Sequence, residues 1–135
     1  MPPPALPVVQ SFILCDYSSV DTAGKVSLCG CFDSFSNAAF PAMFRCSLHA
    51  VLVDGYGKTP VVIELVDLST SAKVVVASGE CDFKNPLRPC SLTIQMTPTF
   101  TKPGTYAFEL SSGGHVFGTR RFEVLHTAQG IAPVL

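Results

Sequence analysis

The sequence has little charge of either sign. Of its 135 residues, 9 are Lys or Arg and 10 are Asp or Glu, so the net charge is −1 and charged residues make up 14% of the chain. A typical domain carries about 25%. Phosphate recognition needs clustered Lys and Arg, and a helix that lies on a membrane surface needs a basic face. The composition therefore argues against nucleic acid and against a membrane as partners.

The sequence also lacks the signs of export. No apolar run approaches the roughly 18 residues that span a bilayer. The segment 1–7 has four prolines and no basic residue before an apolar stretch. No Asn-X-Ser/Thr site is present. We therefore expect a cytoplasmic protein, in which the 6 cysteines are thiols.

Catalytic and cofactor motifs are missing as well. The nucleophile elbow, the phosphate loop and the dinucleotide fingerprint are absent. The three histidines are His49, His115 and His126, and none lies at ligand spacing from another. The Ser-Gly-Gly-His run at 112–115 is typical of a hairpin turn. We therefore expect no enzyme, no cofactor and no catalytic residue.

What the sequence does contain is a β pattern. Residues 43–53 alternate, with Phe44 to Leu52 apolar at every second position and Arg45, Ser47 and His49 between them. This period of two is typical of a half-buried strand. The segment Ser34–Pro41 is expected to be a loop. Turn signals separate about eight such runs at spacings of roughly 10–15 residues, which predicts an antiparallel β-sandwich of about seven to nine strands.

Three regions follow from this pattern. Residues 1–7 form a Pro-rich N-terminal arm, 8–125 a β-sandwich domain, and 126–135 an apolar C-terminal arm. Both arms lack charge, apart from any charge on His126. The predicted core consists of Leu14, Val26, Leu28, Phe32, Leu48, Leu52, Ile63, Leu65, Val74, Leu92, Ile94, Tyr106, Phe108, Phe122 and Val124.

Several short motifs carry a family resemblance. The run from Pro103 to Leu110, a Gly turn and then Arg121–Val124 resembles the final hairpin of many immunoglobulin-like bacterial domains. With Leu14–Tyr17, Gly24–Asp33 and Phe40-Pro41, roughly residues 11–125 are similar to an uncharacterised bacterial family of small cytoplasmic β-sandwich proteins. The resemblance implies an immunoglobulin-like fold and no known activity or catalytic residue.

Two sets of residues have side chains of the kind that hold metal ions. Cys29 and Cys31 are two apart and point to the same side of a strand, so both thiols could reach one ion with Cys46, or with another cysteine, as a third ligand. Zinc sites have a Cys-x2-Cys spacing, and free cysteine usually packs as a small apolar residue, so packing thiols are the preferred interpretation. Three acids, at 16, 21 and 54, are in the same way read as turn residues rather than calcium ligands.

We expect a non-enzymatic structural or adaptor subunit that acts through protein–protein contacts in a larger assembly. A charge-poor surface suits a subunit that neighbours cover. The predicted partner is another protein or further copies of the chain, bound through the two arms. The alternatives are a monomeric binding module for a peptide or small ligand, with a pocket near 54–57 or 113–115, and a zinc-stabilised domain.

Overall fold

The computed structural model describes residues 6–127. Within this range the chain forms strands and turns, and no helix is long and apolar enough to cross a membrane. Most of both predicted arms falls outside the described residues. The strands are β1 (Val8–Val20), β2 (Val26–Cys31), β3 (Ser34–Asn37), β4 (Ala42–Met43), β5 (Cys46–Val53), β6 (Gly57–Asp67), β7 (Lys73–Phe83), β8 (Cys90–Met96), β9 (Thr99–Phe100), β10 (Gly104–Ser112) and β11 (His115–His126).

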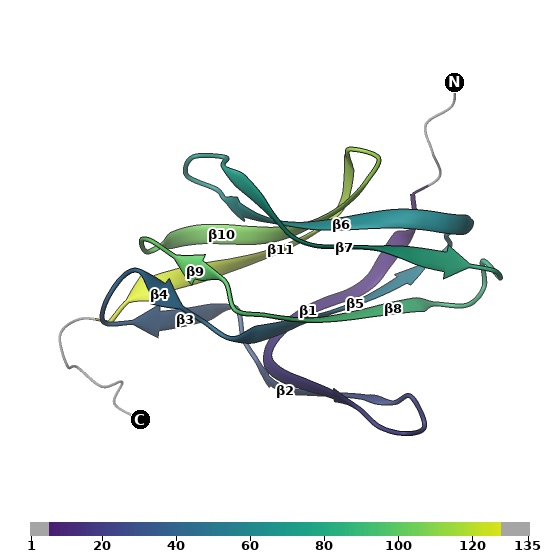
Figure 1. The fold of residues 1–135 in the computed structure, drawn as a ribbon, viewed down its shortest axis with the longest axis horizontal. Helices are drawn as coiled ribbons and strands as arrows, with labels where there is room; N and C mark the ends of the chain where they lie inside the picture. The colour runs from purple at the N-terminus through teal and green to yellow at the C-terminus, as the bar shows by residue number, and fades with distance from the viewer. Residues whose placement is uncertain (1–5, 128–135) are drawn as a thin grey trace.

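The strands form three sheets, and the two larger ones face each other in two layers (Figure 1). The first sheet has four strands in the order β2-β1-β5-β8, and the second has five in the order β3-β11-β10-β6-β7. Neighbouring strands are antiparallel, except that β3 runs parallel to β11. The short strands β4 and β9 pair with each other at one end. The chain is therefore an all-β domain built mainly from antiparallel pairs.

The core lies between the two layers. Alternating residues of β5 meet those of β6, β10 and β11, which gives the inward rows that a period of two predicts. Of the predicted core, the following are buried: Leu14, Leu48, Leu52, Ile63, Tyr106, Phe108, Phe122 and Val124. Phe32, Leu65, Leu92 and Ile94 are partly buried against them.

Three core predictions are wrong. Val74 is 58% exposed, because it lies on β7, the last strand of its sheet, where no further strand covers it. Val26 and Leu28 are only half-buried and do not join the core, because β2 ends the other sheet.

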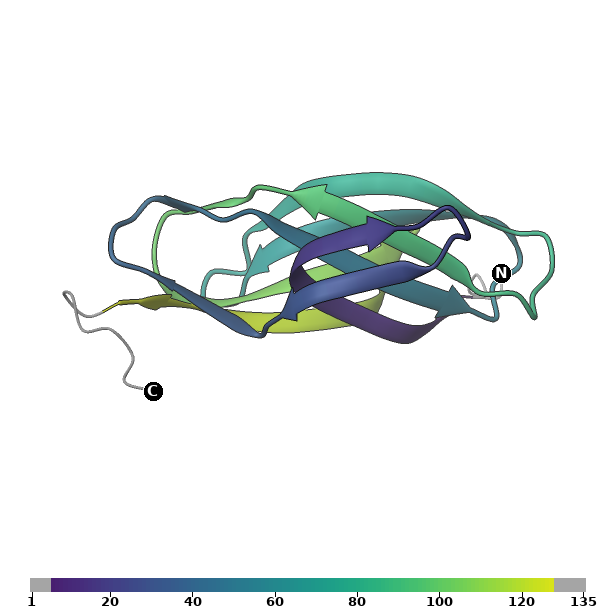
Figure 2. The ribbon, with the colours of Figure 1, turned by 90° about the horizontal axis from the view of Figure 1, so that it is seen from below.

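The strand β1 separates from β5 about halfway along its length. Up to Cys15 it pairs with β5, and beyond that residue it pairs with β2 alone. The later half crosses the outer side of β5 and β8 (Figure 2). There the Ser18 hydroxyl donates to the Ser47 hydroxyl at 3.0 Å, and the Gln95 amide donates to the Ser18 carbonyl at 3.5 Å. The β1–β2 hairpin therefore covers the outer face of β5, while Ser91, Thr93 and Gln95 of β8 stay exposed.

The β1–β2 hairpin shields the outward side chains of β5 from solvent. Ser47 and His49 do alternate with the apolar row, as predicted, but both are buried at 1% and 7% exposure. The half-buried strand that the alternation predicts is thus buried on both faces. Hydroxyl and imidazole groups satisfy one another in this outer layer, so β5 needs no charge there.

The expected loop at Ser34–Pro41 contains a strand. Residues 34–37 form β3, which lies beside Glu123 to His126 of β11. Phe35 anchors this segment, since its ring stacks on Phe44 with centroids 3.9 Å apart. A four-residue strand with one apolar side chain gives no clear period, which is why the pattern suggested a loop.

An aromatic cluster that includes Phe100, Tyr106 and Phe122 fills the core beside Phe35. The Tyr106 ring packs edge-on against Phe100 at 4.9 Å and stacks beside Phe122 at 6.0 Å. Its hydroxyl donates to the carbonyl of Lys102 at 2.7 Å. Burial, and then the nearby Asp67 carboxylate, raise the pKa of the Tyr106 phenol. The bond ties β10 to the turn that precedes it.

Candidate interaction site

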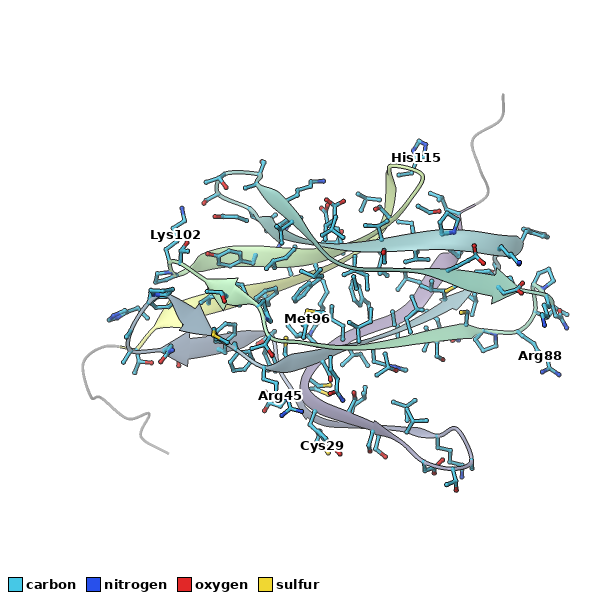
Figure 3. The ribbon with its side chains drawn as sticks, viewed as in Figure 1. Cys29, Arg45, Arg88, Met96, Lys102 and His115 are labelled. Atoms are coloured by element: carbon cyan, nitrogen blue, oxygen red, sulfur yellow. The ribbon has the colours of Figure 1, made fainter. Side chains whose placement is uncertain are left out.

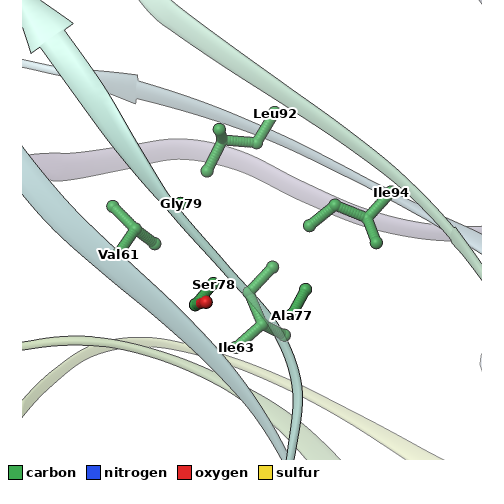
Figure 4. A pocket seen from close by; sticks show the side chains of 7 residues that line it. All are labelled: Val61, Ile63, Ala77, Ser78, Gly79, Leu92 and Ile94. Atoms are coloured by element: carbon green, nitrogen blue, oxygen red, sulfur yellow. The ribbon is translucent and has the colours of Figure 1, made fainter.

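An almost wholly apolar cavity lies between β7 and β8. These strands end two different sheets, and the connection Lys84–Pro89 joins them. This cavity has a volume of about 130 Å³, and we call it the seam. It is lined by Val61, Ile63, Ala77, Ser78, Gly79, Leu92 and Ile94 (Figure 4).

Small residues on β7 leave the seam open. Ala77 and Gly79 pair with Ile63 and Val61 of β6, so they belong to the inward row of that strand. A Cβ atom placed on Gly79 would have no neighbour within 4 Å. Leu92 and Ile94 face them from β8 and are only partly buried. The inward side chains of β7 and β8 therefore do not pack tightly against each other. The cavity between them leaves aliphatic side chains partly exposed at the side of the domain.

Two thiols also lie between β7 and β8. Cys81 is fully buried on β7 and Cys90 begins β8. Burial raises the pKa of Cys81 to about 12, together with a hydrogen bond to the thiol of Cys90. Sequence reasoning did not pair these residues, because only the packing of two separate sheets brings them together.

The cysteines of the less favoured metal alternative, Cys29, Cys31 and Cys46, do not lie together. Cys29 and Cys31 are exposed on β2, and Figure 3 shows Cys29 on this outlying strand. Cys46 is buried on β5, where desolvation raises its pKa to about 11 and disfavours the thiolate that zinc binds. Cys31 instead lies opposite Cys15 of β1. Among residues 6–127, no three His, Cys, Asp or Glu side chains lie close enough to hold a metal ion.

The three histidines lie apart. His49 is buried, and its Nδ1 is 2.9 Å from the Thr93 hydroxyl of β8. Desolvation lowers the pKa of His49, so it tends to stay neutral. His115 lies at the tip of the β10–β11 hairpin (Figure 3), and His126 ends β11. The hairpin turn is explained by Gly113 and Gly114, whose φ angles are +58° and +82°.

Two of the three acids predicted to be turn residues, Asp21 and Asp54, lie in turns, whereas the prediction is wrong for Asp16, which lies within a strand. Asp21 accepts hydrogen bonds from the backbone amides of Ala23 and Lys25, at 2.9 and 2.8 Å. Asp54 has a φ of 60° at the turn after β5. Asp16 lies on β1 beside the positive-φ residue Gly30.

The comparisons with known proteins now bear on this fold. A family model described as a family of unknown function, DUF6941, matches residues 10–125, so the chain belongs to this family. The expected membership in an uncharacterised family is thereby confirmed. A comparison with curated proteins gave no match.

Among solved structures, a small part of several β-glucosidases is similar in backbone to most of this chain. A β-glucosidase from Listeria innocua in complex with isofagomine has 16% identity and a TM-score of 0.48, over 88% of this chain and 17% of the enzyme. A β-glucosidase from Kluyveromyces marxianus in complex with glucose has 12% identity and a TM-score of 0.46, over 84% of this chain and 14% of the enzyme. The chain thus spans about a sixth of those enzymes, and likenesses this distant carry no argument about activity.

Proposed function

We propose that this chain is a non-enzymatic structural or adaptor subunit, which acts through protein–protein contacts in a larger assembly. The observation that carries the proposal is the seam, an aliphatic opening at the side of the domain between two free strand edges. The same edge strand, β7, also exposes Val74 and Val75, at 58% and 60%. Apolar surface of this kind typically marks a contact with another protein.

We propose further that the fold is an immunoglobulin-like sandwich. An immunoglobulin domain places strands A, B and E in one sheet and C, F and G in the other. The order β1-β5-β8 fits A-B-E, and the order β11-β10-β6 fits G-F-C. The Tyr106 bond to Lys102, four residues upstream, fits the tyrosine corner that marks such sandwiches. The β1–β2 hairpin is then an addition that covers one face.

The environment of the buried histidine supports a role without catalysis. A general base needs access to a substrate proton and, in a triad, an acid that orients it. The described hydrogen-bond partner of His49 is the neutral hydroxyl of Thr93, and the β1–β2 hairpin covers this side of the sheet.

The experiment that tests the assembly role is the native mass of the full chain by light scattering, across about a tenfold range of concentration. The same measurement is made on chains without residues 1–7 and without 127–135. We expect the full chain to form a stable oligomer. At least one truncated chain should have a lower native mass while its circular dichroism spectrum still shows β structure. If the full chain is a monomer throughout and also binds no partner in its native extract, the assembly role is wrong.

A second candidate function is a monomeric module that binds an extended peptide. Pockets for drug-sized ligands usually measure about 300–1,000 Å³. The seam is about 130 Å³, and a single aliphatic side chain therefore fits it better than a small molecule does. A monomeric mass together with saturable binding of an aliphatic peptide would favour this candidate.

A further inference from the structure

The four outer strands of the two sheets differ in how their free edges are protected. Exposed edges usually carry charge, a bulge, proline or a very short strand, because these features prevent pairing with another chain. β7 carries Lys73, Glu80 and Asp82 and has a register shift against β6. β3 has only four residues, and β2 has Gly30 at a φ of 68°.

β8 has none of these features. Its seven residues, Cys-Ser-Leu-Thr-Ile-Gln-Met, carry no charge and no proline. Its pairing with β5 runs from Cys90 to Met96 without a register shift. In the part of the chain that the structure describes, β5 is its one paired neighbour. The other edge of β8 is therefore a regular, uncharged strand edge of seven residues.

The fold leaves room for a strand at this edge. In the immunoglobulin order A-B-E-D, a further strand D lies beside strand E. Here β8 fits the place of E, and the chain reaches it from β7 through only Lys84–Pro89. No strand of the described chain occupies the D position beside β8.

The sequence of β8 is complementary to itself in antiparallel pairing. A two-fold axis through Thr93 places Leu92 opposite Ile94 and Cys90 opposite Met96 of the other copy, which are all in the inward apolar row. The outward residues Ser91 and Gln95 then face each other. Because β8 has no charge, the symmetry brings no like charges together, which would destabilise the pair.

We propose that a second copy of this chain pairs with β8, edge to edge and antiparallel, so that the two four-stranded sheets become one continuous sheet across a two-fold axis. The contact is isologous, since each copy offers the same strand. It brings the Leu92 and Ile94 rows of both copies side by side at their seams. This inference rests on the proposed assembly role and names the partner and the strand that it uses.

The test exploits the register of the pair. In this register Ser91 faces Gln95 of the other copy twice, and both residues are exposed in the single chain. The variant Ser91→Lys with Gln95→Lys puts two pairs of lysines face to face. The matched variant Ser91→Lys with Gln95→Glu puts two Lys–Glu pairs in the same places. Both variants lose the same weak bond from Gln95 to the Ser18 carbonyl.

The expected result is that the wild type and the Lys/Glu variant have the same native mass, a multiple of one chain, whereas the Lys/Lys variant has half of it. Circular dichroism and urea unfolding check that each variant is folded. If the Lys/Lys variant does not fold, Ser91→Glu with Gln95→Glu replaces it, because two pairs of glutamates then face each other while the Thr93 hydroxyl beside His49 is kept.

Two outcomes overturn the inference. One is a wild type with the mass of a single chain throughout the concentration range. The other is an oligomer that both double variants leave unchanged or weaken equally, since the register then plays no part. The second outcome leaves the assembly role in place and removes β8 from it, so the two proposals fail separately.

Discussion

The substitution Tyr106→Phe tests how much the turn before β10 depends on one hydrogen bond. The Tyr106 side chain is 6% exposed, and its hydroxyl donates to the Lys102 carbonyl at 2.7 Å. Phenylalanine keeps the ring contacts with Phe100 and Phe122 and removes only the hydroxyl. A net hydrogen bond contributes about 0.5–1.5 kcal/mol. Lys102 is exposed, so water can replace the lost donor, and we expect a loss of about 1 kcal/mol.

Urea unfolding followed by circular dichroism measures this loss. With a slope of about 1–3 kcal/mol/M, the midpoint falls by roughly 0.3–1 M. The control is Tyr17→Phe, because Tyr17 is 53% exposed, and surface changes usually stay within about 0.5 kcal/mol. Equal midpoints in the two variants would show that the bond does not stabilise the fold. A loss above about 3 kcal/mol would show that the ring itself has moved.

The same variant changes the alkaline limb of stability. Because the pKa of Tyr106 is raised in the folded state, the unfolded chain loses this proton first as the pH rises. The unfolding free energy of the wild type therefore falls above the ordinary tyrosine pKa of about 10, and the Phe variant lacks this part of the fall. Parallel curves for the two proteins would contradict the buried position of the phenol.

Three further predictions concern the seam and the buried titratable groups. Gly79→Ala should raise the unfolding free energy by roughly 0.5–1 kcal/mol in urea, because the added methyl meets open space and the unfolded chain loses freedom. The pKa of His49 is lowered on folding, so stability is full above about pH 6.5 and falls as the pH drops below it, and His49→Gln should flatten that fall in acid unfolding curves. A thiol reagent at neutral pH should label the exposed Cys29 in the first phase of the reaction. Cys46 and Cys81 should react only when urea unfolds the chain, because burial raises their pKa to about 11 and about 12. Early labelling of all three would refute this placement of the cysteines.

The alternating segments were the part of the fold that sequence could predict. Leu48 and Leu52 on β5, and Phe108 on β10, are buried as their period of two indicates. The period alone does not show which strands lie at the edge of a sheet. The exposure of Val74, an apolar residue on an edge strand, was therefore not predicted. The period also does not show that β1 separates from β5 beyond Cys15 and crosses its outer face. The burial of His49, which lies on that face, could therefore not be predicted.

The seam could not be predicted from the sequence because no local signal defines it. It forms where β7 of one sheet meets β8 of the other, and their facing rows are set by the register of each with a different partner. A glycine inside a strand, such as Gly79, indicates a weak strand or a close approach of another chain segment. The sequence does not show that Leu92 and Ile94 lie across the cavity from it.

The low charge of the chain gains a local explanation from the structure. A strand edge in water needs charge to stay unpaired, and β7 has it in Lys73, Glu80 and Asp82. β8 has none over seven residues, although its second edge is free in the described chain. The outer face of β5, by contrast, is covered by the crossing β1, and its residues Ser47 and His49 are buried there. Charge is absent from β5 as well, but β5 lies inside its sheet between β1 and β8, whereas an uncharged strand at the edge leaves backbone groups open to pairing. The proposed pair of β8 strands would give the lack of charge at this edge a physical use.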